Sequence, residues 1–360
     1  MTTTTPRQGT RTGIEVHHDA RAIEEEWDRL ALDANASIFA RPAWLRMWWE
    51  EFGEGELEIL TLHDRGRLRA VLPLVRKGAV LQAPLNEHTP LYDPPTRDAE
   101  AAETLYAEAL GRGARRLQVA EVEAGETTTG ALGRAAERLG WRVRMRPLRR
   151  AAFMRVEGSP ADYMAGLSRR RRKDVRRRRR RLEESGELTI EWAGGSERLA
   201  ELLDEGFAVE GSGWKDAAGT AIASRPETDR FYRTVVDWAV GESALDLGFV
   251  RLDGRVLAFQ MAVWDQTRCY GLKGGFDPAF RKAAPGVLLF LDMILRAHER
   301  GVETVELLGD ATPFELEWGA STRPIVRMQA FSPGLSGRVD WLAATYLRPL
   351  LRKLADGFGR

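Results

Sequence analysis

The sequence is poor in residues that crosslink a protein or bind metals. Its one cysteine, Cys269, leaves no internal disulfide, which fits a reducing compartment. Its histidines, at 17, 18, 63, 88 and 298, show no metal-ligand spacing, so we predict no metal. No stretch approaches the ~18 consecutive apolar residues of a transmembrane helix, and residues 1–11 lack the apolar segment of a secretory signal. We therefore expect a cytoplasmic protein without integral membrane association.

The length and composition predict a folded protein of more than one domain. The chain has 360 residues, whereas single hydrophobic cores stop growing at roughly 250–300 residues. Its apolar fraction of 43% is near the globular average, and eleven tryptophans are far more than a disordered chain carries. Two domains are the simplest arrangement that fits these numbers.

Arginine dominates one short block. Residues 169–181 carry a local charge of +10, although the whole chain carries only +1, so the rest of the protein is acidic. Such a block favours a polyanionic partner, either phosphates on a small molecule or a nucleic acid. Apolar residues flank it at helical spacing, which predicts one basic helix over 163–184 that joins two halves. These residues are Tyr163, Met164, Leu167 and Leu182.

The same order of elements recurs in two halves of the chain. In the first half a tryptophan-rich helix begins at Pro42, stops at Gly53 and precedes two strands around a turn at 64–66. In the second half a helix begins at Pro226 and precedes two strands around a turn at 253–254. The repetition predicts an α/β (α+β) protein made of two similar halves.

Further elements follow each pair of strands. In the first half we predict helix 98–112, strand 116–122, helix 127–139 and strand 141–146, after a proline-rich stretch at 84–95. In the second half we predict strand 268–271, loop 274–285, helix 286–300, strand 304–308 and a strand pair around 325–331. An amphipathic helix within 336–360 is expected to pack on the body rather than on a membrane, because its basic residues are few.

The segment 270–301 carries the strongest local signal for ligand binding. A strand leads into a loop with Arg281, Lys282 and Gly286, and the loop opens directly into a helix. Backbone N–H groups at a helix N-terminus are unpaired and carry partial positive charge, and glycine lets a phosphate approach the backbone. The pattern therefore favours a pyrophosphate site, although many ordinary turns share it.

This order of elements is similar to the acyl-CoA core of the GNAT superfamily of N-acyltransferases. The chain most resembles the tandem-GNAT family associated with cellulose biosynthesis, called CelD-like, and more distantly the FemABX peptidyltransferases. The likeness spans roughly residues 14–330 and rests on several short stretches. They are Trp44-Leu45 and Leu72-Pro73-Leu74 in the first half, and Leu167-Ser168-Arg169, Leu182-Glu183, Phe276-Asp277-Pro278 and Pro285-Gly286 in the second.

The resemblance implies two tandem GNAT-like domains with mixed central sheets. We expect a disordered N-terminus over 1–13, an N-terminal domain over 14–150, a C-terminal domain over 151–335 that includes the basic helix, and a C-terminal helix over 336–360. Only the second domain is expected to hold a cofactor, because the first has Pro90 to Pro95 where the second has the basic glycine loop.

The resemblance also implies where acyl-CoA binds. In such enzymes two central strands diverge, and the pantetheine arm pairs with the strand that here contains Cys269 to Lys273. The pyrophosphate would lie on the loop from Arg281 to Gly286. Cys269 itself is expected to pack, because no histidine is close in sequence to activate it. The cofactor-binding candidates are Cys269, Gly271, Lys273, Arg281, Lys282, Pro285, Gly286 and Val287.

The catalytic candidates are Asp310, Glu315 and Tyr270. Asp310 follows a strand at its C-terminal end, where α/β proteins usually bind ligands, and is our choice for the base, although a turn or cap role is as common there. Tyr270 could protonate the departing thiolate. Glu315 stands after Phe314 where related proteins carry a Tyr-Lys pair, so this sequence departs from its relatives there.

The acceptor contacts and the arginine block leave alternatives open. We predict acceptor contacts at Trp214, Lys215, Asp277 and Arg172. The block is either a solvated face paired with carboxylates of the acidic body, or a holder of phosphates through bidentate guanidinium contacts. The phosphates would belong to an anionic acceptor, to the 3′-phosphate of the cofactor or, by likeness to FemABX, to an aminoacyl-tRNA. The block lacks interleaved aromatic residues for stacking bases.

The functional prediction is an N-acyltransferase of the acetyltransferase type. It would transfer an acyl group from acetyl-CoA or another acyl-CoA to an amine or hydroxyl of a saccharide or small molecule, without a metal. One alternative is a FemABX-like peptidyltransferase that uses aminoacyl-tRNA. The other is a non-catalytic phosphate- or nucleic-acid-binding protein on a degenerate GNAT scaffold.

Overall fold

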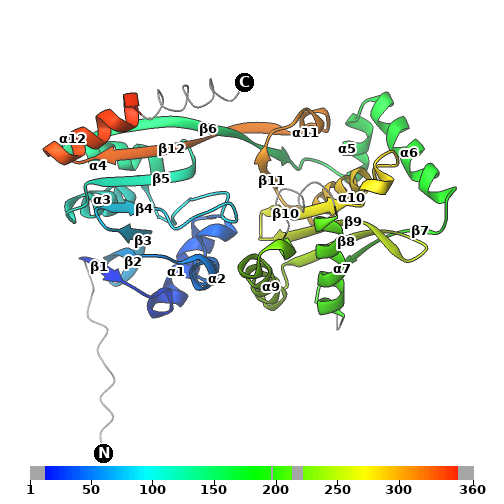
Figure 1. Ribbon diagram of the computed structural model, residues 1–360, viewed down its shortest axis with the longest axis horizontal. Helices are drawn as coiled ribbons and strands as arrows, with labels where there is room; N and C mark the ends of the chain where they lie inside the picture. Colours follow the sequence, from blue (N-terminus) through cyan, green and yellow to red (C-terminus); the bar gives the residue numbers. More distant parts are fainter. Residues whose placement is uncertain (1–12, 196–197, 213–221, 348–360) are drawn as a thin grey trace, which may run out of the picture. The chain divides into compact units, whose positions relative to one another are not determined.

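Two units make up the computed structural model, which describes residues 13–195, 198–212 and 222–347 (Figure 1). The chain up to Arg149 and from Pro324 onward forms unit 1, and Arg150–Arg323 forms unit 2. Each unit is a mixed β-sheet with helices on both faces. The predicted fold class, α/β with two similar halves, is confirmed.

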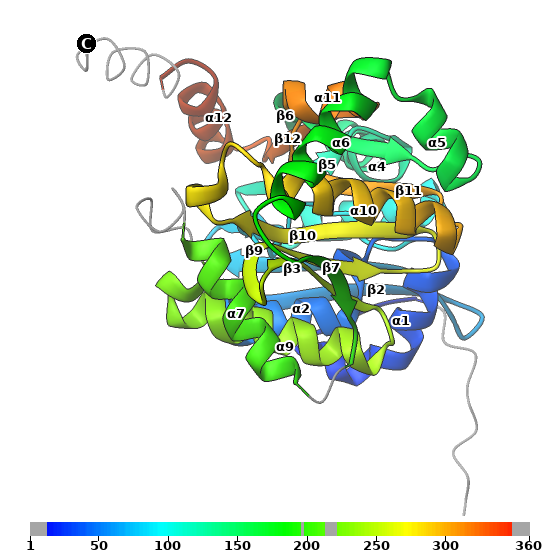
Figure 2. The same ribbon diagram turned by 90° about the vertical axis from the view of Figure 1, so that its right-hand side faces the viewer.

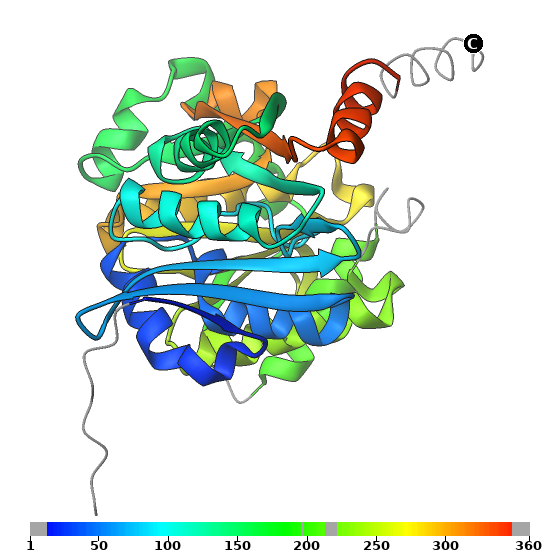
Figure 3. The same cartoon turned by 90° about the vertical axis from the view of Figure 1, so that its left-hand side faces the viewer.

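The sheet of unit 1 has the order β1-β2-β3-β4-β5-β12. Its neighbours are antiparallel except β4 and β5, which are parallel. The strands are β1 (Gly13–His17), β2 (Glu56–Asp64), β3 (Arg67–Lys77), β4 (Val80–Gln82), β5 (Arg116–Glu123) and β12 (Ser321–Phe331). Helices α3 (Ala99–Gly111) and α4 (Ala131–Arg138) share one core with alternate residues of β3, while α1 (Glu24–Asp33) and α2 (Pro42–Phe52) lie on the other face (Figure 3).

The sheet of unit 2 repeats this order as β7-β8-β9-β10-β11-β6. Only β10 and β11 are parallel. The strands are β7 (Leu188–Ala193), β8 (Leu245–Leu252), β9 (Arg255–Trp264), β10 (Arg268–Phe276), β11 (Thr304–Asp310) and β6 (Arg142–Arg155). Helices α5 (Pro160–Gly166), α6 (Arg169–Glu183) and α10 (Pro285–Arg300) pack together on one face, and α7 (Leu199–Gly211) and α9 (Pro226–Gly241) lie on the other (Figure 2).

The last strand of each half is exchanged between the units. In unit 2, β11 pairs with the end of β6, from Ala151 to Arg155, and in unit 1, β5 pairs with β12 from Ile325 to Phe331. We expected the second domain to run continuously to residue 335, but the chain returns to unit 1 at Pro324. The difference arises because β12 pairs with β5 of unit 1 from Ile325 onward, while β6 continues for 14 residues, past the strand predicted over 141–146.

Local sequence signals explain several element boundaries. Pro42 and Pro226 each stand in the first turn of their helices, where a missing N–H costs nothing. Both hairpin turns place two consecutive residues at positive φ, Arg65-Gly66 and Asp253-Gly254, as a two-residue type I′ turn requires. The predicted hairpins are therefore confirmed in both halves.

Two predicted helices differ from the structure. The basic helix over 163–184 is divided, because Leu167 is extended and Ser168 caps a new helix, α6. The C-terminal helix begins earlier, as α12 (Leu335–Leu342) continued by a turn over Ala343–Leu347. We expect its apolar side to pack on the body, yet Leu342 and Tyr346 are 49% and 63% exposed, and its predicted part from residue 348 onward lies outside the described residues. Its other side holds it to unit 1 through an Asp340–Arg115 ion pair of 2.8 Å.

Candidate functional site

The central feature of unit 2 is the divergence of β10 from β11. Their parallel pairing covers only Arg268 to Tyr270 on β10, opposite Thr304 to Glu306 on β11. Beyond this point β10 continues along β9 as far as Phe276, whereas β11 has an irregular register with β6 and places Leu308 at φ 62°. A left-handed residue inside a strand turns the chain, so β11 bends away from β10.

Helix α10 begins just beyond the diverging end of β10. Its N-cap residue, Ala284, has a left-handed backbone with φ 49°, and its methyl side chain accepts no hydrogen bond from the first turn. Arg281 and Lys282 precede it and are exposed, while Gly286 and Val287 in the first turn are half-buried. An uncapped helix N-terminus beside two exposed cations is suited to a phosphate group.

The candidates of the glycine loop lie together at this helix start. A Cβ atom on Gly286 would meet only Phe276, at 3.8 Å, so the first turn is not closed by neighbouring protein atoms. Pro285 is buried and supplies no N–H, and the N–H of Val287 bonds to the carbonyl of Ala284 at 3.0 Å. These candidates therefore share one place at the helix start, with Gly286 four residues after the exposed Lys282.

The candidates on β10 separate into two groups. Cys269 is fully buried and its backbone pairs with strands on both sides, so it belongs to the core; burial also raises the pKa of its thiol. Gly271 and Lys273 lie beyond the pairing with β11, next to the divergence. The Lys273 ammonium lies 5.0 Å from the ring centre of Tyr232 on α9.

Two of the three catalytic candidates have structural partners. Tyr270 is fully buried and its hydroxyl donates to Asp265 at 2.7 Å and accepts from Arg268 at 3.0 Å, so it is held inside the hairpin end. The Glu315 carboxylate accepts from the N–H of Thr312 at 2.7 Å, as part of a capping box that starts α11 (Pro313–Glu317). Asp310 is exposed at the end of β11.

Two of the predicted acceptor contacts also have partners within the protein. Arg172 donates to the carbonyls of Met164, Ala165 and Leu167, and so caps the end of α5. Asp277 is buried, pairs with Arg255 and accepts from the N–H of Ala279 at 2.9 Å. Trp214 and Lys215 lie outside the described residues.

A buried ion pair at the point of divergence was not predicted. Glu306 is 2% exposed, is the last β11 residue paired with β10, and pairs with Arg323. Thr304 also donates to its carboxylate at 3.2 Å. Because neighbouring residues of a strand point to opposite faces, Glu306 lies on the face opposite Val305, which packs in the core under α10. The sequence signal for this buried pair is a charged residue between apolar residues of a strand, in Val305-Glu306-Leu307.

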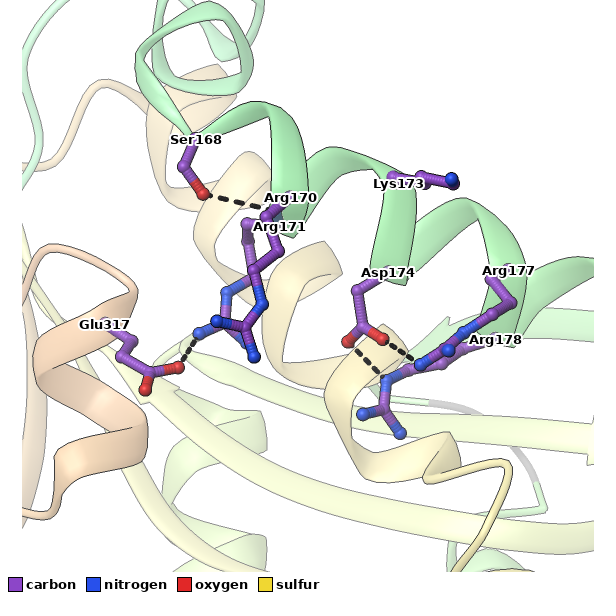
Figure 4. A pocket seen from close by; sticks show the side chains of 8 residues that line it. All are labelled: Ser168, Arg170, Arg171, Lys173, Asp174, Arg177, Arg178 and Glu317. Atoms are coloured by element: carbon purple, nitrogen blue, oxygen red, sulfur yellow. Dashed lines mark hydrogen bonds and ion pairs between the residues drawn. The ribbon is translucent and has the colours of Figure 1, made fainter.

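The arginine block forms one wall of an open groove of about 760 Å³ (Figure 4). The other wall is α11, which contributes Glu317. Figure 4 shows Arg171 reaching across to Glu317, while Asp174 holds Arg177 and Arg178 along the helix. The lining residues are Ser168, Arg170, Arg171, Lys173, Asp174, Arg177, Arg178 and Glu317.

In unit 1 the corresponding space between the third and fifth strands is filled by the chain itself. The N–H of Tyr92 donates to the carbonyl of Glu121 on β5 at 2.7 Å. The N–H of Val71 on β3 donates to Pro95 at 3.0 Å, and Arg97 donates to the carbonyl of Arg69 at 2.8 Å. Segment 92–97 therefore bonds to both strands, in the place where unit 2 has its divergence.

Two further features are absent from the described residues. None of the helices there is both long and apolar enough to cross a bilayer. The described residues also hold no group of three or more histidine, cysteine or carboxylate side chains arranged for a metal ion.

Comparison with known proteins finds a similarity to one type of domain within unit 2. Residues 169–316 match the family model described as an acetyltransferase (GNAT) domain. No curated protein sequence is significantly similar to the chain.

Solved structures show the same fold at low sequence identity. FemX matches with a TM-score of 0.63 and 14% identity, over 91% of this chain and 99% of that one. The C-terminal domain of a putative lysylphosphatidylglycerol synthetase from Agrobacterium fabrum matches with a TM-score of 0.55 and 16% identity, over 91% and 97%. A conserved protein of unknown function from Bacteroides thetaiotaomicron matches with a TM-score of 0.53 and 13% identity, over 89% and 100%.

Proposed function

We propose that the protein is an N-acyltransferase that uses acyl-CoA bound to unit 2. Its acceptor would be an amine or hydroxyl of a saccharide or small molecule. The observation that carries the proposal is the divergence of β10 and β11 directly beside the uncapped N-terminus of α10. The match of residues 169–316 to a GNAT acetyltransferase domain supports the same reading.

The residues present fit acyl-CoA. The first turn of α10, from Pro285 to Val287, and the exposed Arg281 and Lys282 would hold the diphosphate. The part of β10 beyond Tyr270 would hold the pantetheine arm, because strand backbone is a natural partner for its amide groups. Acyl-CoA supplies the chemistry as an activated thioester.

The residues of the chain would supply orientation and proton transfer. Asp310, exposed at the end of β11, is our proposed general base for the attacking amine, directly or through a water molecule. Backbone N–H groups of β10 near the divergence would donate to the acyl carbonyl oxygen and stabilise the negative charge that develops there. The Glu306–Arg323 pair would act as a positioning element that fixes β11 where it leaves β10.

Calorimetric titration with acetyl-CoA tests the proposal, with Gly286→Glu as the diagnostic variant. A carboxylate in the first turn is compatible with the helix dipole and has room at Gly286, so the fold should survive. Its charge opposes a diphosphate, so we expect the affinity to fall by at least about tenfold, or ~1.4 kcal/mol.

Gly111→Glu is the matched control, because it adds the same carboxylate to open space in unit 1. It should bind acetyl-CoA like the wild type. The proposal fails if the wild type binds no CoA thioester, or if Gly286→Glu binds as tightly as Gly111→Glu.

A further inference from the structure

Most charges of α6 are not neutralised by the acidic body. Five of its cations pair with carboxylates, and only one of these, Arg171, pairs with a residue outside the helix and its C-cap. The others have no carboxylate partner among the described residues. They are Arg169, Arg170, Arg172, Lys173, Arg176 and Arg181. The solvated-face interpretation therefore accounts for only part of the block.

Two kinds of cation line the groove between α6 and α11. Arg171 is fixed, since its guanidinium lies 4.9 Å from the ring centre of Trp318 and pairs with Glu317. Arg178 is fixed by Asp174 at 2.7 Å. Arg170 and Lys173 also line the groove but have no carboxylate partner in the described part of the chain. A groove with preorganised and unsatisfied cations is suited to an anion with more than one charge.

The groove adjoins the helix that is proposed to bind the diphosphate. Val175 and Leu182 of α6 pack in one core with Leu288 and Leu291 of α10. The α11 wall rests on α10 as well, because the rings of Phe314 and Phe290 are 5.2 Å apart. Phe290 follows Pro285 by five residues, about 7.5 Å along the helix axis. Both sites therefore border α10, on the same face of the unit 2 sheet.

The α11 wall also carries one exposed aromatic side chain, whereas the sequence of α6 has none. Phe314 is 37% exposed and lies one helical turn before Glu317 on α11. Its ring is 6.0 Å from Trp318, which lies under Arg171. Trp318 is fully buried, so Phe314 is the ring of this pair that a base could contact.

We infer that the groove between α6 and α11 binds the phosphorylated adenosine end of acyl-CoA, with Arg170 and Lys173 directed to its 3′-phosphate. The inference rests on the proposed function, because it assigns a second part of the same ligand. It gives the arginine block a role in selecting CoA over molecules that carry only the pantetheine arm and diphosphate.

Titration with CoA and with 3′-dephospho-CoA tests the assignment, because the two ligands differ only in the 3′-phosphate. We expect the wild type to bind CoA more tightly by on the order of tenfold, as for a charge-assisted contact. In the double variant Arg170→Gln/Lys173→Gln this ratio should fall toward one, while binding of 3′-dephospho-CoA stays unchanged. Arg181→Gln is the matched control on the same helix outside the groove, and it should keep the wild-type ratio.

The outcomes separate this inference from the proposed function. Equal wild-type affinity for the two ligands would overturn the inference and leave the acyltransferase proposal intact. Equal weakening of both ligands in the double variant would also overturn it, since that indicates a structural role. If neither CoA nor 3′-dephospho-CoA binds the wild type, the proposed function itself is contradicted. Salt-sensitive binding of single-stranded RNA that the double variant loses, with the CoA ratio unchanged, would assign the groove to RNA instead.

Discussion

Units 1 and 2 have the same strand order but differ at one place, between the third and fifth strands. In unit 2, β10 follows β9 to Phe276 and diverges from β11 after Tyr270. In unit 1, β4 is only three residues long, and segment 92–97 bonds to both β3 and β5 beyond it. In unit 1 a segment of the chain therefore fills the position beside β5, whereas in unit 2 β10 and β11 separate.

The fifth strands of the two units, β5 and β11, have a similar backbone although unit 1 is filled and unit 2 is open. Glu121 on β5 and Leu308 on β11 both have positive φ, 53° and 62°, so both strands turn near their C-terminal ends. In unit 1 the carbonyl of Glu121 accepts from Tyr92, and its carboxylate holds Arg149 at 2.8 Å. The segment after the fourth strand, rather than the fifth strand, decides whether a unit is filled. We therefore expect ligand binding in unit 2 alone.

Loss of the proposed base in unit 2 should have the largest effect of the changes that we predict, and it should act on kcat. Asp310→Ala removes the exposed carboxylate at the end of β11, so kcat should fall by roughly 10²–10⁴-fold. Acetyl-CoA affinity should not change. The measurement is steady-state transfer to an acceptor found by screening amines and hydroxyl compounds.

Glu315→Gln is the control for the Asp310 variant, because the amide can still accept from Thr312 in the capping box. It should retain nearly full activity. If Asp310→Ala turns over like the wild type, another group or water alone removes the proton.

Removing a side chain from the segment that fills unit 1 should destabilise the protein without creating a second ligand site. Tyr92 is 5% exposed, packs in the unit 1 core and donates from its hydroxyl to the carbonyl of Pro73 at 2.7 Å. Tyr92→Ala should lower the free energy of unfolding by about 3–5 kcal/mol, measured in urea. In unit 1 the helix after the fourth strand, α3, is capped by the side chain of Asp98, so the stoichiometry of acetyl-CoA should stay at one.

The conservative change Tyr92→Phe keeps the ring and loses only the hydroxyl contact. It should cost about 1–3 kcal/mol, the penalty for a buried carbonyl without its donor. A stoichiometry of two in Tyr92→Ala would show that the closing segment alone suppresses a site in unit 1.

The smallest expected effect concerns an ion-pair cluster specific to unit 1. Burial alone would raise the pKa of Glu58, but hydrogen bonds and charges from Arg76 and Arg112 outweigh it and lower that pKa below its usual value. A lowered pKa in the folded state contributes stability above the unfolded pKa, near 4.5, and this stability is lost as the pH falls through the folded value. Glu58→Gln should therefore cost about 1–2 kcal/mol at pH 7 and less at pH 3.

Urea unfolding at both pH values checks this difference for wild type and variant. Glu54→Gln serves as the control, since its pair with Lys77 at 2.8 Å is exposed and should contribute little. An equal cost of Glu58→Gln at both pH values would exclude the ionised carboxylate as its source.

Sequence signals that act locally predicted most elements. Proline at a helix start, glycine after a helix end and two-residue turns gave α2, both hairpins and α10 nearly to the residue. Short strands such as β4 were missed because three residues carry no periodic pattern. The exchange of β6 and β12 was missed because strand partners are set by tertiary pairing, which no local signal specifies.

The candidate site was predictable to a similar extent. The position of the helix start at Gly286 and of Asp310 at a strand end followed from the order of elements. The side-chain partners did not follow from that order. Nearby residues of a cap or turn form hydrogen bonds with Arg172, Asp277 and Glu315. Polar residues at turns have such local partners, and the sequence alone does not separate these from ligand contacts.

The central claim is that acyl-CoA binds to the open strand and helix start of unit 2 and that unit 1 stays closed. Amide hydrogen exchange with and without acetyl-CoA tests this residue by residue. We predict slower exchange in 271–276 on β10 and in the first turn of α10, with no change in 92–97 of unit 1. Unchanged exchange in unit 2 at saturating acetyl-CoA, or protection confined to unit 1, would contradict the account.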